Sequence, residues 1–344
     1  MGLRAYVAKR TINTIILLFF VITLNFVIFE LIPGSQGSIE ILAGSGKLRT
    51  QAQYERLLNM YNFCKHYDNV TGVCTPNTIW DRYVPYVRNM LTFQFGISYQ
   101  TGHDVTEDMI QSGRLANTLV LIGLSSVLSL VIGVLLGVGA AHWRGRLFDT
   151  ANVTSSLILY SLPTFWLGVM LLYFFFNTLH IFPGAGVTPA DWSILGKPDL
   201  LGEIAVRLRH LFLPTLTLTL ISYGGFLLLT RATMMEVMNE DYIVTARAKG
   251  IPERNVLFKH ALKNASLPIV TSAALSFGFI LTGALITETV FSWKGLGLWI
   301  WQSIGWKDFP VIQAMFYIVA LMVIFANFAS DLIYGMIDPR IKYE

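Results

Sequence analysis

The sequence predicts an all-α integral membrane protein with six transmembrane helices. Of its 344 residues, 54% are hydrophobic and only 13% are charged, about half the charged fraction of a typical soluble domain. The mean hydropathy is +0.56. Six apolar runs also reach the roughly 20 residues that a helix needs to cross a bilayer. These runs lie at 11–33, 115–141, 151–179, 211–233, 268–290 and 310–336.

The first run follows Arg4, Lys9 and Arg10, as a secretory signal peptide would. Its apolar stretch exceeds the ~7–15 residues of such a signal and no A-x-A cleavage site follows, so we interpret it as a retained anchor. Six spans place both termini on one side. The short segments 142–150 and 234–267 are basic, which indicates that they and both termini are cytoplasmic.

This topology predicts four regions. Residues 1–33 form the N-terminal tail and first helix, and 34–113 form an extracytoplasmic domain. Residues 114–336 form a five-helix core that includes the cytoplasmic loop 234–267, and 337–344 form a cytoplasmic tail. Two further segments, 181–210 and 292–309, are expected outside; the second carries four tryptophans and is typical of an interfacial aromatic re-entry.

Small residues predict close packing between spans. Gly133, Gly137 and Ala141 recur every four residues in the second span, and Ala274 and Gly278 do so in the fifth; this spacing lets another backbone approach. Helix packing is the simpler interpretation, but a weakly polar pathway between helices uses similar side chains. The same two interpretations apply to the hydroxyls of the fourth span, Thr215, Thr217, Thr219, Ser222 and Thr230.

Ionisable residues are nearly absent from the middles of the spans, and Glu30, Glu236, Glu288 and Asp331 lie near span ends. Ion-coupled transporters and channels usually need such groups at depth. We therefore expect the energy for any transport to come from outside this chain.

Catalytic and metal-binding patterns are also lacking. "AGSGKLRT" (43–50) resembles a phosphate-binding loop, but Ile41 and Leu48 replace its first glycine and its hydroxyl. The six histidines show no H-x-x-x-H spacing, and the net charge of +4 is modest. We predict no covalent chemistry, no metal site and no nucleic-acid partner.

Both cysteines, Cys64 and Cys74, lie in the outer segment 34–113 and enclose nine residues. Outside the cytosol such a pair closes readily and contributes about 2–3 kcal/mol. Two free thiols are the alternative. Asn69 begins a sequon in the same loop and is a candidate glycosylation site if the host glycosylates its surface proteins.

The basic stretch "DYIVTARAKGIPERNVLFKHALKNASLP" (241–268) predicts two short helices with a bend between them. Asp241 is placed to cap a helix over 242–249, and Gly250 to end it in a left-handed conformation. Pro252 suits the first turn of the next helix, and Pro268 is expected to open the fifth span. The basic residues of 241–268 could by themselves be membrane anchors, or the stretch could lie against anionic lipid. Small residues beside a bend favour insertion into a partner's groove.

"YIVTARAKGIPERNVLFKHALKNASLPIVT" resembles the cytoplasmic EAA loop of binding-protein-dependent ABC importer permeases, in the form of the B-type subunit of the peptide/nickel (dipeptide and oligopeptide) branch. "RLANTLVLIGLSSVLSLVIGVLLGVGAA", "TETVFSWKGLGLWIWQSIGWKDFPVIQA" and "DLIYGMIDPRIKY" agree with it. The resemblance implies the type I importer (MetI-like) permease fold, with a large external insertion between the first two helices.

In that family the loop is a coupling helix that docks in a groove of the ATPase subunit. Thr245 and Ala246 match the last two positions of the EAA triplet, Val244 stands in place of its Glu, and Gly250 is the loop glycine. The coupling residues implied are Thr245, Ala246, Arg247, Lys249, Gly250, Ile251 and Pro252.

The resemblance implies a non-catalytic subunit without cofactors of its own. It implies a second homologous permease, two ATPases that carry ATP and Mg²⁺, an extracytoplasmic substrate-binding protein and a lipid membrane as partners. The implied cargo is a di- or oligopeptide; oligosaccharides and nickel, carried by the same branch, remain alternatives. An ion-coupled secondary transporter or channel is the alternative of a different class.

Overall fold

The computed structural model describes residues 3–30, 64–67, 74–190, 192 and 196–337. Side chains at 3–4, 30, 64–67, 74–76, 274–283, 330 and 333–337 lie outside that description. The chain divides into two compact units, each described here by itself. One comprises Met1–Thr11, Ala116–Leu298 and Phe325–Glu344, and the other Ile12–Leu115 and Trp299–Ile324.

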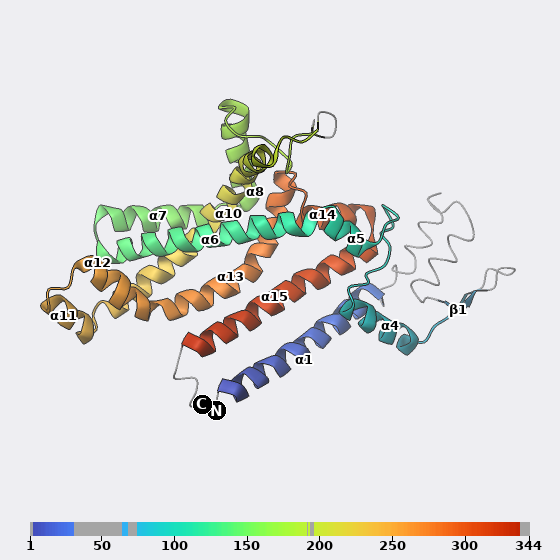
Figure 1. Cartoon of the computed structure of the whole chain (residues 1–344), viewed down its shortest axis with the longest axis horizontal. Coiled ribbons are helices and arrows are strands. Elements are labelled where there is room, and N and C mark those ends of the chain that lie inside the picture. The colour runs from blue at the N-terminus through green and yellow to red at the C-terminus, as the bar shows by residue number, and fades with distance from the viewer. Residues whose placement is uncertain (1–2, 31–63, 68–73, 191, 193–195, 338–344) are drawn as a thin grey trace. The chain divides into compact units, whose positions relative to one another are not determined.

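The described chain is predominantly helical (Figure 1). Its longer helices are α1 (Leu3–Glu30), α6 (Arg114–His142), α7 (Leu147–Ser161), α10 (Leu200–Val237), α13 (Leu262–Val290) and α15 (Phe309–Ile337). Shorter ones are α4 (Ile79–Leu91), α5 (Val105–Gln111), α8 (Thr164–Leu171), α11 (Asp241–Ala248), α12 (Glu253–Asn255) and α14 (Leu296–Trp306), with the π-helices η1 (Leu172–Thr178) and η2 (Val256–Ala261). Strands β1 (Cys64–Tyr67) and β2 (Cys74–Pro76) pair antiparallel.

Four helices in the described residues, within α1, α6, α10 and α15, are long and apolar enough to cross a membrane. A fifth span results if α7 and the α8–η1 helix count as one, but these are bent by 103°. The prediction of one continuous span over 151–179 is therefore wrong. Leu162 is extended, with ψ of 137°, because a residue that precedes a proline, here Pro163, is disfavoured in the helical region. The predicted total of six spans is not confirmed.

The glycine pattern of the second span is confirmed as a packing seam between α6 and α10. A Cβ atom added at Gly133 would lie 2.5 Å from Cβ of Phe226 and 2.6 Å from the carbonyl oxygen of Tyr223. One added at Gly137 would lie 2.6 Å from Cβ of Thr230. Only glycine permits this approach. The corresponding prediction for Ala274 and Gly278 concerns side chains outside the described part.

Most hydroxyls of the fourth span face the interior of this chain. Thr215, Thr217, Thr219 and Thr230 are all buried, and Thr217 donates to the carbonyl of Leu213 at 2.9 Å. This burial favours the packing interpretation over a pathway lined by these groups. The helix is also longer than its predicted span, since α10 begins at Leu200 rather than near 211.

The segment expected as an aromatic re-entry forms α14. Asp308 follows α14 and is 1% exposed. Within its unit, its carboxylate accepts hydrogen bonds from the Ser98 hydroxyl (2.6 Å) and from the backbone N–H groups of Tyr99 and Gln100 (both 3.1 Å).

In the pair of strands β1 and β2, Cys64 pairs with Pro76 and Cys74 with Tyr67. The cysteine side chains and Asn69 lie outside the described residues, so the disulfide and the glycosylation site stay predictions.

Candidate functional site

The bend at Gly250 has the geometry expected from the sequence. Gly250 has a φ of +71°, which an L side chain adopts only with strain. Its N–H donates to the carbonyl of Arg247 at 2.9 Å, and the N–H of Ile251 donates to that of Ala246 at 3.3 Å. These two bonds are those of a Schellman motif. They end α11 and turn the chain sharply toward α12.

Three details of the hairpin differ from the prediction. Glu240, not Asp241, is the N-cap of α11, and it makes no side-chain capping bond. Pro252 is the N-cap of α12 rather than its first helical residue; one residue of displacement is common at helix ends. Pro268 lies inside α13, which begins at Leu262, so the hairpin runs into this helix without a break at the proline.

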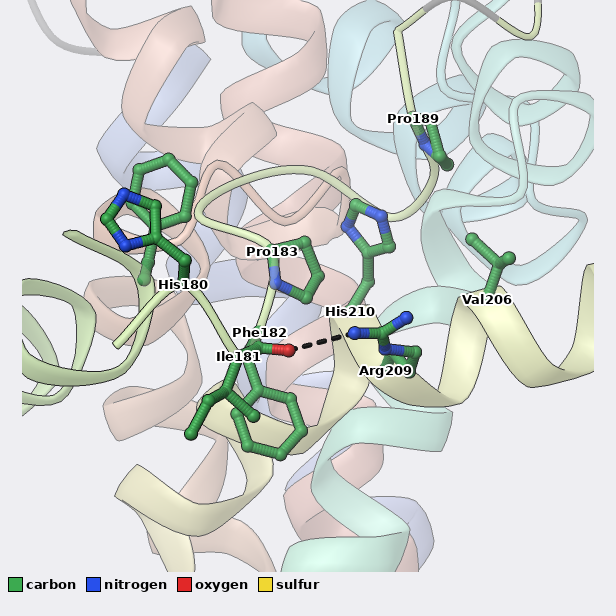
Figure 2. Close-up of a pocket in the computed structure, with 9 residues that line it drawn as sticks. His180, Ile181, Phe182, Pro183, Pro189, Val206, Arg209 and His210 are labelled. Atoms are coloured by element: carbon green, nitrogen blue, oxygen red, sulfur yellow. Dashed lines mark hydrogen bonds between the residues drawn. The ribbon is translucent and has the colours of Figure 1, made fainter. Parts of the chain in front are cut away.

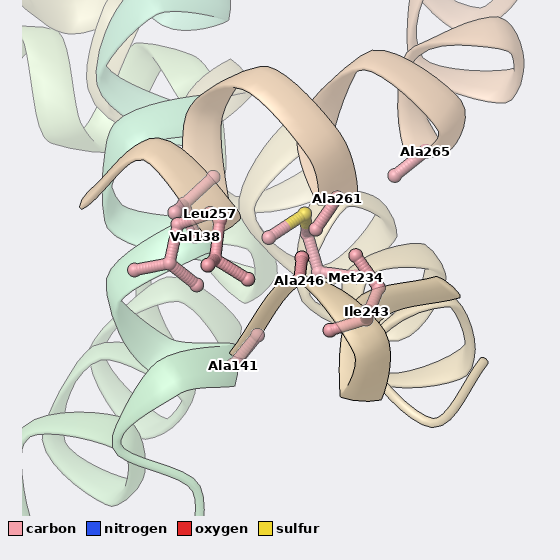
Figure 3. Close-up of a cluster of buried hydrophobic side chains, with 9 residues drawn as sticks. Val138, Ala141, Met234, Ile243, Ala246, Leu257, Ala261 and Ala265 are labelled. Atoms are coloured by element: carbon pink, nitrogen blue, oxygen red, sulfur yellow. The ribbon is translucent and has the colours of Figure 1, made fainter. Parts of the chain in front are cut away.

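One face of the hairpin is buried against the rest of the unit. Ile243 is 0% and Ala246 is 6% exposed, and Figure 3 shows them with Met234 of α10 and with Val138 and Ala141 of α6. From α12 onward, Val256, Leu257, Ala261 and Ala265 complete the cluster. The small residue at 246 thus admits close packing within this chain, and the hairpin is anchored to the ends of α6 and α10.

The opposite face combines apolar and basic side chains. Val244 is 57% exposed, Tyr242 42% and Phe258 41%. Of the predicted coupling residues, Ile251 is half-buried and Ala246 is buried, whereas the others are exposed: Thr245, Arg247, Lys249, Gly250 and Pro252. A rigid hairpin with such a face can dock in a groove and transmit displacement to α6 and α10.

An ion pair closes the bend. Arg247 contacts Glu253 at 2.8 Å, and Nδ1 of His142, the last residue of α6, lies 3.7 Å from the same carboxylate. The hydrogen bond from Arg247 lowers the pKa of Glu253 below its usual 4.5, against the opposing effect of burial. Arg247 therefore serves the internal geometry of the hairpin as well as its surface. The described residues contain no group of three His, Cys, Asp or Glu side chains able to hold a metal ion.

Two buried carboxylates stabilise this unit; the sequence did not point to Asp149, and it placed Glu288 only near a span end. Asp149, in the first turn of α7, is 3% exposed and is bound by Arg231 of α10. An acidic residue just after a short basic loop, with an arginine near the end of an apolar helix, was the available signal.

The second is Glu288, which is 0% exposed near the end of α13. It accepts from the Thr118 hydroxyl at 2.6 Å and from the N–H of Leu298 at 3.0 Å. A Cβ at Gly295 would collide with this carboxylate, so only glycine leaves room for it. The glutamate thereby positions the start of α14, and the glycines of "KGLG" were the signal for it.

Comparison with known proteins shows the family to which this chain belongs. Residues 133–343, which include the hairpin, match the family described as binding-protein-dependent transport system inner membrane component. The chain belongs to this family. The chain is 34% identical to the di/tripeptide transport system permease protein DppB of Pseudomonas aeruginosa (strain UCBPP-PA14), with 99% of each chain covered. It is 33% identical to the oligopeptide transport system permease protein AppB of Bacillus subtilis (strain 168), with 98% and 99% covered.

A solved structure of this fold also matches. An inward-facing structure of the MetNI methionine ABC transporter superposes with a TM-score of 0.51 at 18% identity, covering 67% of this chain and 96% of the transporter chain. The predicted MetI-like fold is confirmed. The protein is thus a multi-pass membrane permease subunit of a binding-protein-dependent ABC importer.

Proposed function

We propose that this permease forms half of a translocation pathway for di- or oligopeptides and couples it to ATPase subunits through residues 241–252. The observation that carries the proposal is the two-sided hairpin. Ile243 and Ala246 anchor it to α6 and α10, while Tyr242 and Val244 stay exposed. An exposed apolar surface of this kind is typical of a site for another protein.

The predicted coupling residues then divide into three roles. Thr245, Lys249 and Pro252 are exposed and would contact the ATPase groove. Ala246 and Ile251 pack inward, so they would hold the helix in place. Arg247 and Gly250 would fix the bend, the first through Glu253 and the second through its positive φ.

The assembly we propose contains a second homologous permease, two ATPases and an extracytoplasmic substrate-binding protein in a lipid membrane. ATP and Mg²⁺ would be bound by the ATPases, so this chain would be non-catalytic and free of cofactors. Both termini and the hairpin would face the cytoplasm, as the basic short segments favour, and residues 34–113 would face the binding protein.

The named peptide permeases support the peptide cargo, since identity of about a third extends over nearly the whole chain. Oligosaccharides and nickel are the alternatives. The test is uptake of a labelled dipeptide by cells with and without this gene, together with the identity of the ligand held by the co-encoded binding protein. A binding protein that retains a sugar or nickel, with no dipeptide uptake, would overturn the peptide cargo.

A channel or ion-coupled transporter is less well supported. The buried carboxylates Asp149 and Glu288 are held by hydrogen bonds from Arg231 and Thr118, as structural groups are. Reconstituted importer separates the two classes. ATP-dependent uptake that stops when the ATPases are inactivated supports the proposal, and uptake by this chain alone along an ion gradient contradicts it.

A further inference from the structure

A pocket of about 400 Å³ lies between the end of η1, the following loop and the N-terminal part of α10 (Figure 2). Phe176, Phe182 and Val206 line its apolar wall, and Arg209, His180 and His210 supply polar groups. Phe182 also stacks on Phe212 of α10 at 4.3 Å, which holds the loop in place. The pocket is distant in sequence from the hairpin at 241–252.

Arg209 has hydrogen-bonding capacity left for a ligand. One of its terminal nitrogens donates to the carbonyl of Ile181 at 2.9 Å, whereas a guanidinium carries five N–H donors. Beside it, Nδ1 of His210 donates to the carbonyl of Gly186 at 3.1 Å, so this side chain helps to hold the loop, and Arg209 is the donor left for a ligand. A guanidinium beside an aromatic wall suits an anion that carries an apolar body.

The position of Arg209 along α10 sets its depth in a membrane. Arg209 and Arg231 enclose 21 residues, 210–230, that include no Asp, Glu, Lys or Arg. At a helical rise of 1.5 Å per residue this segment is about 32 Å long, close to the hydrocarbon thickness of a bilayer. Arg209 therefore lies at the level of the lipid headgroups.

Apolar side chains continue from the pocket toward the hydrocarbon. Phe212 is 44% exposed and Phe174 51%, and they offer a surface to acyl chains. The pocket lining itself favours an anion, since it contains the guanidinium of Arg209 and no carboxylate.

We propose that this pocket binds the phosphate headgroup of an anionic phospholipid, with Arg209 as its principal ligand. A guanidinium binds phosphate in bidentate fashion, which suits the headgroup of a lipid in the outer leaflet. The carboxylate of a peptide cargo has related chemistry, but the headgroup depth and the exposed apolar surface favour the lipid.

The test uses the full chain in phosphatidylcholine nanodiscs with and without phosphatidylglycerol, and native mass spectrometry to measure retained phosphatidylglycerol. Arg209→Gln is expected to weaken retention about fivefold, the effect of one basic side chain at a membrane surface. Val206→Trp should weaken retention as well, because the indole fills the pocket while the charge of Arg209 is unchanged. Arg207→Gln is the matched control: Arg207 lies on the same helix, pairs with Glu203 at 2.7 Å and lies outside the pocket lining.

The site is supported if Arg209→Gln and Val206→Trp lose bound phosphatidylglycerol while Arg207→Gln retains it. Retention in Arg209→Gln, or equal loss in Arg207→Gln, overturns it. Unfolding temperatures in a zwitterionic detergent show whether each variant is folded, and Arg209→Lys, which keeps the charge, should retain part of the lipid. A parallel measurement with a dipeptide distinguishes the sources: if Arg209→Gln abolishes dipeptide binding and leaves phosphatidylglycerol retention intact, the lipid proposal is wrong.

Discussion

Arg231 binds Asp149 through two hydrogen bonds, of 2.6 Å from Nε and 2.8 Å from a terminal nitrogen. The same carboxylate accepts a bond from the N–H of Gly145 at 2.9 Å. One buried acid thereby joins the turn between α6 and α7 to α10. The buried face of the hairpin packs against α6 and α10, so the Asp149–Arg231 pair supports the surface that the hairpin contacts.

Asp149→Asn should destabilise the permease by about 2–4 kcal/mol, because removing one member of a buried ion pair leaves the other charge uncompensated. The measurement is the unfolding temperature in detergent. The double variant Asp149→Asn, Arg231→Gln should lose less stability than the two single variants lose together, since it leaves no unpaired charge. Strictly additive losses would show that the two residues do not interact.

Gly133→Ala should destabilise the protein by about 1–3 kcal/mol, the usual cost of overpacking. The added carbon would meet the backbone oxygen of Tyr223 at 2.6 Å, which cannot move without shifting α10. Gly123 lies in the same helix and has nothing within 4 Å of an added Cβ. Gly123→Ala should therefore be neutral, or stabilising by up to about 1 kcal/mol through helix propensity. Equal losses in both variants would exclude close packing as the cause.

The Arg247–Glu253 pair predicts a pH dependence of the bend. The folded-state pKa of Glu253 is lowered, so its contribution is present above the usual value of 4.5 and is lost as the pH falls through the lowered pKa. Both side chains are about 40% exposed, so the contribution is below about 1 kcal/mol. Amide exchange at Gly250 and Ile251 should be faster in Glu253→Gln than in the wild type at neutral pH. The two rates should converge in acid, and a difference that persists there would assign the effect to another cause.

Cys64 and Cys74 remain predicted to form a disulfide on the outer side. Tryptic digestion with and without a reductant, followed by mass analysis, should show one linked peptide pair that separates on reduction. Two alkylated thiols in the unreduced sample would contradict the bond. The Cys64→Ser variant should then unfold more easily by about 2–3 kcal/mol if the entropy of the loop is the stabilising factor.

Local chemistry predicted some parts of this structure well. The four-residue spacing of Gly133 and Gly137 determines which face of α6 approaches α10, and the bend at Gly250 follows from the one residue type that adopts positive φ readily. Both features depend on neighbours in the chain and on backbone sterics, so a single sequence is enough to read them.

Other parts depend on distant partners, which the sequence does not reveal. Hydropathy over 151–179 is continuous, and Pro163 alone does not predict the break, because prolines are often tolerated in transmembrane helices. Ala246 was interpreted as a surface for a partner, yet it is 6% exposed and packs within this chain. Small residues serve both purposes, and only the placement of α6 and α10 distinguishes them.

Gly250→Pro should uncouple ATP hydrolysis from uptake while the protein remains inserted in the membrane. Proline requires φ near −65° where the chain has +71°, and it removes the N–H that bonds to Arg247. The Schellman motif would be lost, and Val244 and Lys249 would no longer have a fixed position relative to α6 and α10. Gly250→Asn is the matched control, because asparagine tolerates the left-handed region, and it should retain most of the uptake. Both variants are compared in reconstituted importer by ATPase activity and by uptake. Normal uptake in Gly250→Pro would exclude the hairpin as the coupling element, since a groove-docked helix cannot work without a defined end.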